Sequence, residues 1–412
     1  YISTRNKNLN FGFKDVFLRG LAPEGGLFIP KKIKTYSESE LKNFSKMSYV
    51  ELATEIISKF FYPNIEKNKL NKLIEKSYNN FTTKEVVKIK KIGNINLIEL
   101  YHGPTLAFKD VAMQVIGNLY DELKLSSEKK INIVVATSGD TGSAAMAAFQ
   151  YSSQIDMFVL FPKDGVSEVQ RRQMTTISNS SLYPIAIRGD FDDCQSLVKQ
   201  MFNDLPFREK VSLAGVNSIN WARILAQVVY YFSAAVSVGS PYRKVNFTVP
   251  TGNFGDIYAA FVAKKMGLPI DKLIIATNQN DILHRALSSG IYERKKLRRS
   301  MSPSMDIQVA SNFERLLYNF YQGDGDKINS MMDEFLRVGK LKIEDKALEA
   351  FRESFWSGVT SEIETERTIA NSLAKYDALV CPHTAVGLHV AEKFQSYNNR
   401  VPMITLATAH PS

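Results

Sequence analysis

Residues 131–149 read INIVVATSGDTGSAAMAAF, and this stretch indicates which class of fold the chain adopts. The apolar run at 131–136 is rich in Ile and Val, which predicts a buried strand. It ends in a loop with two glycines, and a run of small residues follows that predicts a helix. A strand that leads through a glycine loop into a helix is the repeating unit of α/β folds with parallel sheets.

The same alternation of short apolar runs with amphipathic segments continues to the end of the chain. Further buried strands are predicted at 155–162, 182–187, 211–216, 245–250, 272–278 and 401–408, and a helix at 220–239. Residues 1–90 are rich in Lys and Asn and predict mostly helix. We therefore expect an N-terminal domain over 1–91, a smaller α/β domain over 92–240 and a larger one over 241–412. These boundaries are approximate, because the two α/β domains can interleave.

Composition favours an ordinary soluble globular protein over several other classes of protein. The two cysteines form no disulfide framework or CxxC pattern, and the five histidines show no metal-ligand spacing, so we expect a cytoplasmic protein without a metal. We also expect no membrane partner, because no apolar stretch looks long enough to span a bilayer. Nothing in the sequence indicates an obligate protein partner.

The chain is basic, with a net charge of +10, which suits anionic ligands including nucleic acid. The densest basic cluster, ERKKLRR at 293–299, falls in a predicted loop, where it either faces solvent or binds an anion. No nucleic-acid-binding motif or basic stripe is present, so nucleic acid is not an expected partner.

Three loops between a predicted strand and a predicted helix have the composition of anion sites. The loops are TSGDTG at 137–142, TGNFGD at 251–256 and the PHT turn at 382–384. Glycines let the backbone approach a ligand, and the free N–H groups that begin a helix attract anions. The alternative in each case is a capped turn, because Ser, Thr and Asp are also ordinary helix caps.

A single lysine stands in unusually apolar surroundings, in YHGPTLAFKD at 101–110. Lys109 either begins a helix with its amine in water or has a covalent function. Together with three anion loops, such a lysine fits pyridoxal 5′-phosphate, which requires a Schiff-base lysine, a phosphate cradle and a partner for its ring nitrogen. Desolvation lowers the pKa of a lysine and so favours the reactive free amine.

Seven segments of the chain, taken in order, resemble the signature segments of the threonine synthase family. They are HGPTLAFKD, VVATSGDTGSAA, FPKDGVSEVQRRQM, VNSINWARILAQ, VPTGNFGDI, SPSMDIQVASNFERLL and PHTAVG. The resemblance extends from the STR at 3–5 to the LATAHP at 406–411, and so covers essentially the whole chain. One departure is Cys381, which stands before PHTAVG where an acidic residue is expected.

This resemblance implies an α/β protein of fold type II among pyridoxal-phosphate enzymes, similar to the tryptophan synthase β chain. The expected architecture is two α/β domains with parallel or mixed sheets and a mostly helical N-terminal domain. The implied enzyme is a carbon–oxygen lyase acting on phosphates. It converts O-phospho-L-homoserine and water to L-threonine and phosphate by γ-elimination and β-addition of water, in the last step of threonine biosynthesis.

The resemblance also implies roles for particular residues. Lys109 is the Schiff-base lysine, and Thr384 faces the pyridine nitrogen of the cofactor. The cofactor-phosphate loop consists of Gly252, Asn253, Phe254, Gly255 and Asp256. The loop for the amino-acid end of the substrate contains Ser138, Asp140 and Thr141.

Two basic residues are our candidates for the substrate phosphate. Lys163 follows a predicted strand, and Arg223 begins a predicted helix. Arginine recognises phosphate through two donors, and lysine acts as a point charge. The alternative for both is a surface or structural ion pair. The nearest alternative for the whole chain is another fold type II enzyme, a serine or threonine dehydratase or a phospho-lyase that forms 2-ketobutyrate.

Overall fold

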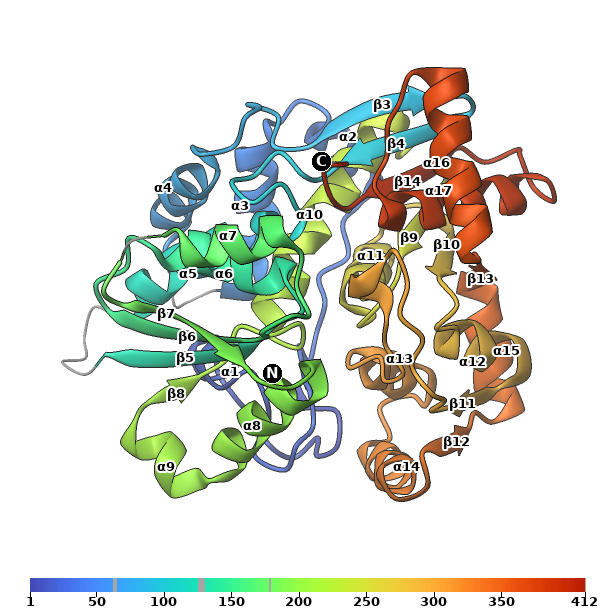
Figure 1. The fold of residues 1–412 in the computed structure, drawn as a ribbon. Helices are drawn as coiled ribbons and strands as arrows, with labels where there is room; N and C mark the ends of the chain where they lie inside the picture. The colour runs from blue at the N-terminus through green and yellow to red at the C-terminus, as the bar shows by residue number, and fades with distance from the viewer. Residues whose placement is uncertain (62–64, 125–129, 178, 412) are drawn as a thin grey trace.

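The computed structural model describes residues 1–61, 65–124, 130–177 and 179–411. Two separate sheets, of four and six strands, lie on opposite sides of the molecule in Figure 1. Most of the buried side chains on and around both sheets belong to one continuous apolar core. The α/β class predicted from the sequence is confirmed.

Helices make up most of the regular structure in the N-terminal segment, as predicted. Its elements are β1 (Ile2–Ser3), α1 (Phe13–Arg19), β2 (Phe28–Ile29), α2 (Glu38–Phe44), α3 (Tyr49–Phe61) and α4 (Lys67–Tyr78), with β1 antiparallel to β2. A capping box at Ser37 and Glu40 fixes where α2 begins.

The smaller sheet has four parallel strands in the order β7-β6-β5-β8. The strands are β5 (Ile131–Ala136), β6 (Ile155–Pro162), β7 (Leu182–Ile187) and β8 (Leu213–Ala214). The helices of this part of the chain are α5 (Lys109–Lys124), α6 (Asp140–Phe149), α7 (Glu168–Thr175), α8 (Phe191–Asn203), α9 (Leu205–Lys210) and α10 (Trp221–Val238).

The expectation of burial was wrong for β7, which is an edge strand. Tyr183 and Ile185 are 41% and 39% exposed, because β7 pairs on one side only, with β6. Pro184 lies between them, and proline is tolerated at an edge because it has no N–H to donate to a further strand.

The larger sheet has six strands in the order β13-β10-β9-β14-β4-β3, all parallel except β3. Its strands are β3 (Lys88–Ile92), β4 (Ile95–Glu99), β9 (Val245–Pro250), β10 (Ile270–Thr277), β13 (Phe355–Val359) and β14 (Met403–Ala407). The remaining elements are α11 (Gly255–Lys265), α12 (Ile282–Ser289), β11 (Ile291–Glu293), η1 (Pro303–Met305), α13 (Phe313–Phe320), α14 (Gly325–Val338), β12 (Lys340–Lys342), α15 (Asp345–Ser354), α16 (Glu362–Tyr376) and α17 (Pro382–Gln395).

Strand β4 shows how the two α/β regions interleave. It precedes the smaller sheet in the chain, yet it pairs with β14, near the opposite end of the chain. The domain boundaries at 91/92 and 240/241 remain a prediction. Strand β4 lies before the second boundary in the sequence but belongs to the sheet of the domain that follows it.

Helix α10 connects the two halves. It packs against α3 and α5 on one side and against α11 on the other. Asn220 caps its beginning, and Gly239 ends it in a left-handed conformation at φ 118°. Contrary to our expectation, this helix is long and apolar enough to span a membrane by composition, but 83% of it is buried inside the protein. It is a core helix.

A buried carboxylate ties the N-terminus to the larger half of the protein. Glu314 of α13, 4% exposed, accepts a hydrogen bond from Thr4 and pairs with Arg5 at 2.8 Å. Arg5 Nε also donates to it, at 3.1 Å. These contacts span more than 300 positions of sequence.

Replacing this carboxylate is expected to destabilise the protein. Glu314→Ala leaves Arg5 and Thr4 without their buried acceptor, at a cost of about 3 kcal/mol in the free energy of unfolding. Urea denaturation measures this loss. Glu334→Ala, at an exposed position of α14, is the control and is expected to change little. Equal stability of the two variants would contradict this account of the N-terminus.

Candidate active site

The lysine turn is shaped by the aspartate that follows the lysine. The Thr105 N–H donates to Asp110 Oδ2 at 2.8 Å, and the Thr105 hydroxyl donates to Oδ1 at 2.7 Å. Leu106 takes a left-handed conformation at φ 59° to complete the turn. Burial raises the pKa of Asp110 to about 6, and the bonds from Thr105 act in the opposite direction.

Strand-like contacts with the distant end of the chain fix this turn. The Phe108 N–H donates to the carbonyl of Thr408 at 2.8 Å, and the His410 N–H donates to that of Leu106 at 2.9 Å. Lys109 thus begins α5 with its side chain only 10% exposed. The alternative in which the amine of Lys109 lies in water is wrong, and its covalent function stays a prediction.

Asp140 is the partner of Lys109 and the centre of the polar network in the site. Its Oδ2 accepts from Lys109 Nζ at 2.8 Å and from the Ser304 hydroxyl at 2.9 Å. Its Oδ1 accepts from Gln170 Nε2 at 2.5 Å. Burial acts to raise the pKa of Asp140, but the nearby charges and the bonds from Lys109 and Ser304 hold it below its usual value. Asp140 is therefore a carboxylate at neutral pH.

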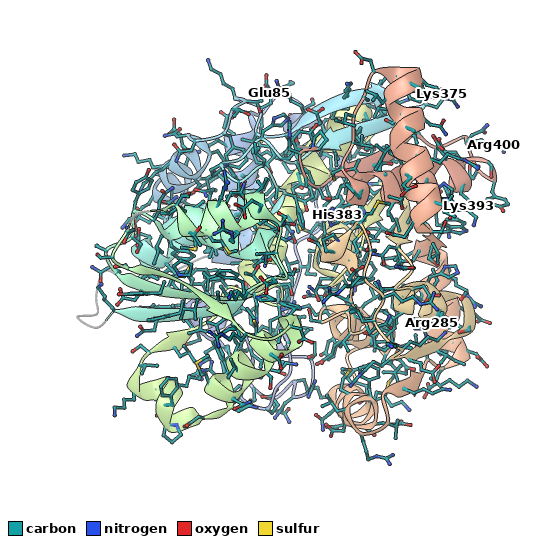
Figure 2. The ribbon with its side chains drawn as sticks, viewed as in Figure 1. Glu85, Arg285, Lys375, His383, Lys393 and Arg400 are labelled. Carbon is teal, nitrogen blue, oxygen red and sulfur yellow. The ribbon has the colours of Figure 1, made fainter. Side chains whose placement is uncertain are left out.

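His383 lies close to this network, near the middle of the molecule in Figure 2. Its Nε2 accepts a hydrogen bond from the Ser304 N–H at 3.2 Å, which places the ring proton on Nδ1. Burial lowers the pKa of His383 to about 4, and the positive charge of Lys109 acts in the same direction. His383 is therefore neutral at neutral pH.

The TGNFGD loop connects β9 to α11 and turns sharply between them. Phe254 has φ 63°, a left-handed conformation, and its side chain is buried. At Gly252 a Cβ atom would lie 2.6 Å from the carbonyl oxygen of Ser304, so only glycine fits there. The loop thus brings backbone N–H groups to the start of α11, where they favour an anion.

The side chain of Asp256 does not oppose an anion at this helix start, because it faces α10. Its Oδ1 accepts from the hydroxyls of Tyr230 and Tyr231, while its Oδ2 has no partner among the described residues. Burial raises the pKa of Asp256 to about 6.

Arg223 is a buried cation with capacity to bind an anion. Its side chain lies in the cavity wall, and its Nη1 makes one long contact of 3.5 Å to the carbonyl of Val216. Its Nε has no partner within the described part of the chain. Burial lowers the pKa of Arg223 to about 10, so the guanidinium stays charged at neutral pH.

The structure brings most of the predicted site residues to one cavity. Those that line it are Lys109, Asp140, Thr141, Arg223, Gly252, Asn253, Phe254, Gly255 and Asp256. Ser138 lies in the loop just before α6, outside the lining, and Lys163 is exposed after β6. Thr384 is buried in the first turn of α17, where its hydroxyl lies 3.2 Å from Cys381 Sγ. Cys381 is the N-cap residue of α17, so its position is a structural one.

Several lining residues were not predicted from the sequence, among them Ser304 and His383. Ser304 lies in the SPSMDIQ segment and Gln170, which binds Asp140, in the EVQRRQM segment, two of the stretches that carry the family resemblance. Polar side chains within these segments were a signal from which both residues could have been predicted as part of the site. His383 has no local signal of a role in the site, because nothing in its own segment indicates that Asp140 lies nearby.

These residues fit pyridoxal phosphate. The amine of Lys109 faces the cavity, the glycine loop leaves room where a Cβ would clash, and Arg223 Nε lacks a partner among the residues that the structure describes. No group of three or more His, Cys, Asp or Glu side chains in the described residues could hold a metal ion.

The fold and this site define a pyridoxal-phosphate-dependent enzyme, and residues 93–401 match the family of that description. Residues 1–78 match the family described as the threonine synthase N terminus. The chain is 45% identical to the threonine synthase of Pseudomonas aeruginosa over 412 residues, which cover 100% of this chain and 88% of that protein. The protein belongs to the threonine synthase family.

Solved structures agree with this assignment. The pyridoxal-phosphate-bound threonine synthase of Brucella melitensis superimposes with a TM-score of 0.96 at 46% identity, covering 100% of this chain and 88% of that one. The yeast threonine synthase gives 0.93 at 40% identity, covering 99% and 87%. The fold type II prediction and the cofactor prediction are confirmed.

Adding one methyl group to the loop is expected to weaken cofactor binding. Gly252→Ala forces Cβ against the Ser304 carbonyl, and over-packing of this kind costs about 1–3 kcal/mol. Absorbance titration of the cofactor-free protein with pyridoxal phosphate measures the change. Gly12→Ala is the control, because its Cβ meets nothing closer than 3.7 Å. Equal cofactor affinity of the two variants would argue against the cradle.

The neutral His383 predicts how stability depends on pH. Its pKa is about 4 in the folded protein and about 6.5 in the unfolded chain, so between these values the unfolded chain binds more protons. Stability contributed above pH 6.5 is lost as the pH falls towards 4. Because glutamine does not titrate, the free energy of unfolding of the His383→Gln variant is expected to fall by up to about 3 kcal/mol less than that of the wild type over this pH range. Urea denaturation of wild type and variant across the window tests it, and parallel curves would contradict it.

Proposed function

We propose that this protein converts O-phospho-L-homoserine and water to L-threonine and phosphate, with the roles set out below for its residues. The observation that carries the proposal is the buried amine of Lys109, held 2.8 Å from Asp140 across a cavity from the glycine loop at 252–255. This arrangement provides a covalent attachment point and a phosphate cradle in one cavity.

Bound pyridoxal phosphate supplies an electron sink for charge left on carbon when a proton is removed. Lys109 would hold its aldehyde, and residues 252–256 would bind its phosphate through backbone N–H groups at the start of α11. Thr384 would face the ring nitrogen, because a hydroxyl can donate to a neutral nitrogen. Either atom can be the donor in its 3.2 Å contact with Cys381 Sγ, and when the thiol donates, the hydroxyl proton of Thr384 is available for the ring nitrogen.

The start of α6 is suited to the carboxylate of the substrate. The first N–H groups of a helix have no intrahelical acceptor, and here they belong to Asp140 and Thr141. The Asp140 side chain is itself negative and is engaged with Lys109, so Asp140 would contribute its backbone, with Ser138 and Thr141 adding hydroxyls.

Arg223 is the better supported of the two candidates for the substrate phosphate. It lines the cavity with an unused donor at Nε, whereas Lys163 is exposed outside the lining. Charge-assisted bonds from a buried guanidinium to a phosphate are strong. The assignment of Lys163 stays a prediction that requires movement of its side chain.

Asp140 supports the proton transfers that Lys109 must perform. A carboxylate at 2.8 Å stabilises the protonated amine after it takes a proton from substrate carbon. Ser304 and Gln170 hold the carboxylate from two sides, which keeps Lys109 Nζ in one position through successive transfers. Location in the cytoplasm is part of the same proposal, and two free, buried cysteines support it.

Product analysis on O-phosphohomoserine tests the reaction. Purified protein with pyridoxal phosphate is expected to release phosphate and threonine in equal amounts. Formation of 2-ketobutyrate in place of threonine would instead identify a phospho-lyase and overturn the proposal.

Lys109→Ala is expected to lower turnover by at least about a thousandfold and to abolish the visible absorbance of the lysine-bound cofactor. Lys109→Arg is the matched variant, because it keeps a cation beside Asp140 but cannot bond covalently to the aldehyde. It is expected to be equally inactive. Activity in either variant would exclude Lys109 from catalysis.

A further inference from the structure

A second cavity lies along β13, the edge strand of the larger sheet, between α12 and α17. All five residues of β13 line it, together with parts of α12, α15, β10 and α17. We call it the β13 groove. It shares no lining residue with the active-site cavity.

The charged residues of the β13 groove all have the same sign. Four basic side chains line it, and no Asp or Glu is among its lining residues in the described chain. The basic residues, each from a different element, are Lys272, His284, Arg352 and Lys393. Three of the four are cations at neutral pH, because burial lowers the pKa of His284 from its usual value. Converging cations without a carboxylate favour an anion over a ligand ammonium.

Two of these basic groups are held in place by bonds that leave other donors unused among the described residues. Lys272 Nζ donates to the carbonyls of Arg352 at 2.9 Å and Glu353 at 2.6 Å, which leaves one of its three protons. Arg352 donates from Nε and Nη2 to the carbonyls at the end of α12, which leaves Nη1.

The other two basic residues complete the set. His284 Nδ1 lies 2.9 Å from the hydroxyl of Ser357, and its Nε2 has no partner among the described residues. Lys393 makes no hydrogen bond or ion pair through its ammonium in the part of the chain that is described, and its side chain is exposed. A ligand would therefore meet preorganised donors and one exposed lysine that no bond among the described residues holds.

The floor of the groove is apolar and aromatic. Leu287 and Phe355 are buried beneath it, and Trp356 packs edge-on against Phe394 at 5.3 Å between ring centroids. A small hydrated anion would leave this surface unused, whereas a ligand with an apolar body would cover it.

We propose that the β13 groove is a second ligand site that binds a small organic carboxylate with an apolar body. The carboxylate meets Lys393, Arg352 and Lys272 at the rim, and the apolar part lies against Trp356 and Leu287. An amino acid is a weaker ligand, because no carboxylate among the described lining residues can pair with its ammonium.

The site is separate from catalysis in space. His383 and Lys393 lie near opposite ends of α17, and ten residues of helix correspond to about 15 Å. Figure 2 shows His383 near the middle of the molecule and Lys393 towards its edge. Substitutions in the groove are therefore expected to leave basal turnover unchanged.

Calorimetric titration of the holoenzyme with three probes of one shape tests the site. The probes are 4-phenylbutyrate, its neutral amide and 4-phenylbutylamine, with inorganic phosphate as a fourth ligand. We expect 4-phenylbutyrate to bind and the other three not to bind. Lys393→Gln is expected to weaken 4-phenylbutyrate at least about tenfold, the value of one charge-assisted hydrogen bond. Lys375→Gln on α16, also exposed, makes the same charge change outside the groove and is expected to bind as wild type does.

Four results would overturn the proposal. They are no binding of 4-phenylbutyrate at millimolar concentration, equal binding of the three organic probes, binding of phosphate as tight as that of 4-phenylbutyrate, and equal affinity of the Lys393 and Lys375 variants. Unchanged turnover in both variants verifies that each is folded. Trp356→Phe provides a second measurement, because the change in tryptophan fluorescence on binding is expected to disappear with it.

Discussion

The ion pair between Lys109 and Asp140 is the interaction on which the arrangement of the active site depends. Both groups are largely buried, so neither charge is tolerable without the other. Asp140 also accepts a hydrogen bond from Ser304 in the larger half of the protein and one from Gln170 in the smaller half. A single carboxylate therefore ties Lys109 to both sides of the cavity and keeps its amine in one place.

Segments that are far apart in the chain make this ion pair possible. The turn before Lys109 is bonded to residues 408–410, and the glycine loop at 252–255 fits beneath Ser304 only because it lacks a Cβ at Gly252. Helix α10 carries Arg223 into the cavity and supplies the two tyrosines that draw Asp256 away from the anion site. The same architecture leaves β13 at the edge of its sheet, where α12 and α17 form the walls of a basic groove.

Much of the site was predictable from local sequence. Lys109, the TSGDTG loop and the TGNFGD loop stand where a buried strand gives way to a helix, and their chemistry is apparent within a few residues. Ser304 and His383 were missed because their function depends on Asp140, which lies more than 160 residues from Ser304. The exposed position of Lys163 was also beyond local reasoning, since its strand-end setting matches that of true site residues.

The sequence by itself determined the class of fold, seven of the ten strands in the two larger sheets and the family, because hydrophobic periodicity and glycine placement are local constraints on the backbone. It also determined that one lysine had an unusual environment. Only the tertiary structure decided that Asp140 is the partner of Lys109, that β4 belongs to the larger sheet, that β7 is an edge strand and that four basic groups meet beside β13. Each of these depends on contacts between distant segments, which packing of the whole chain determines and no local pattern encodes.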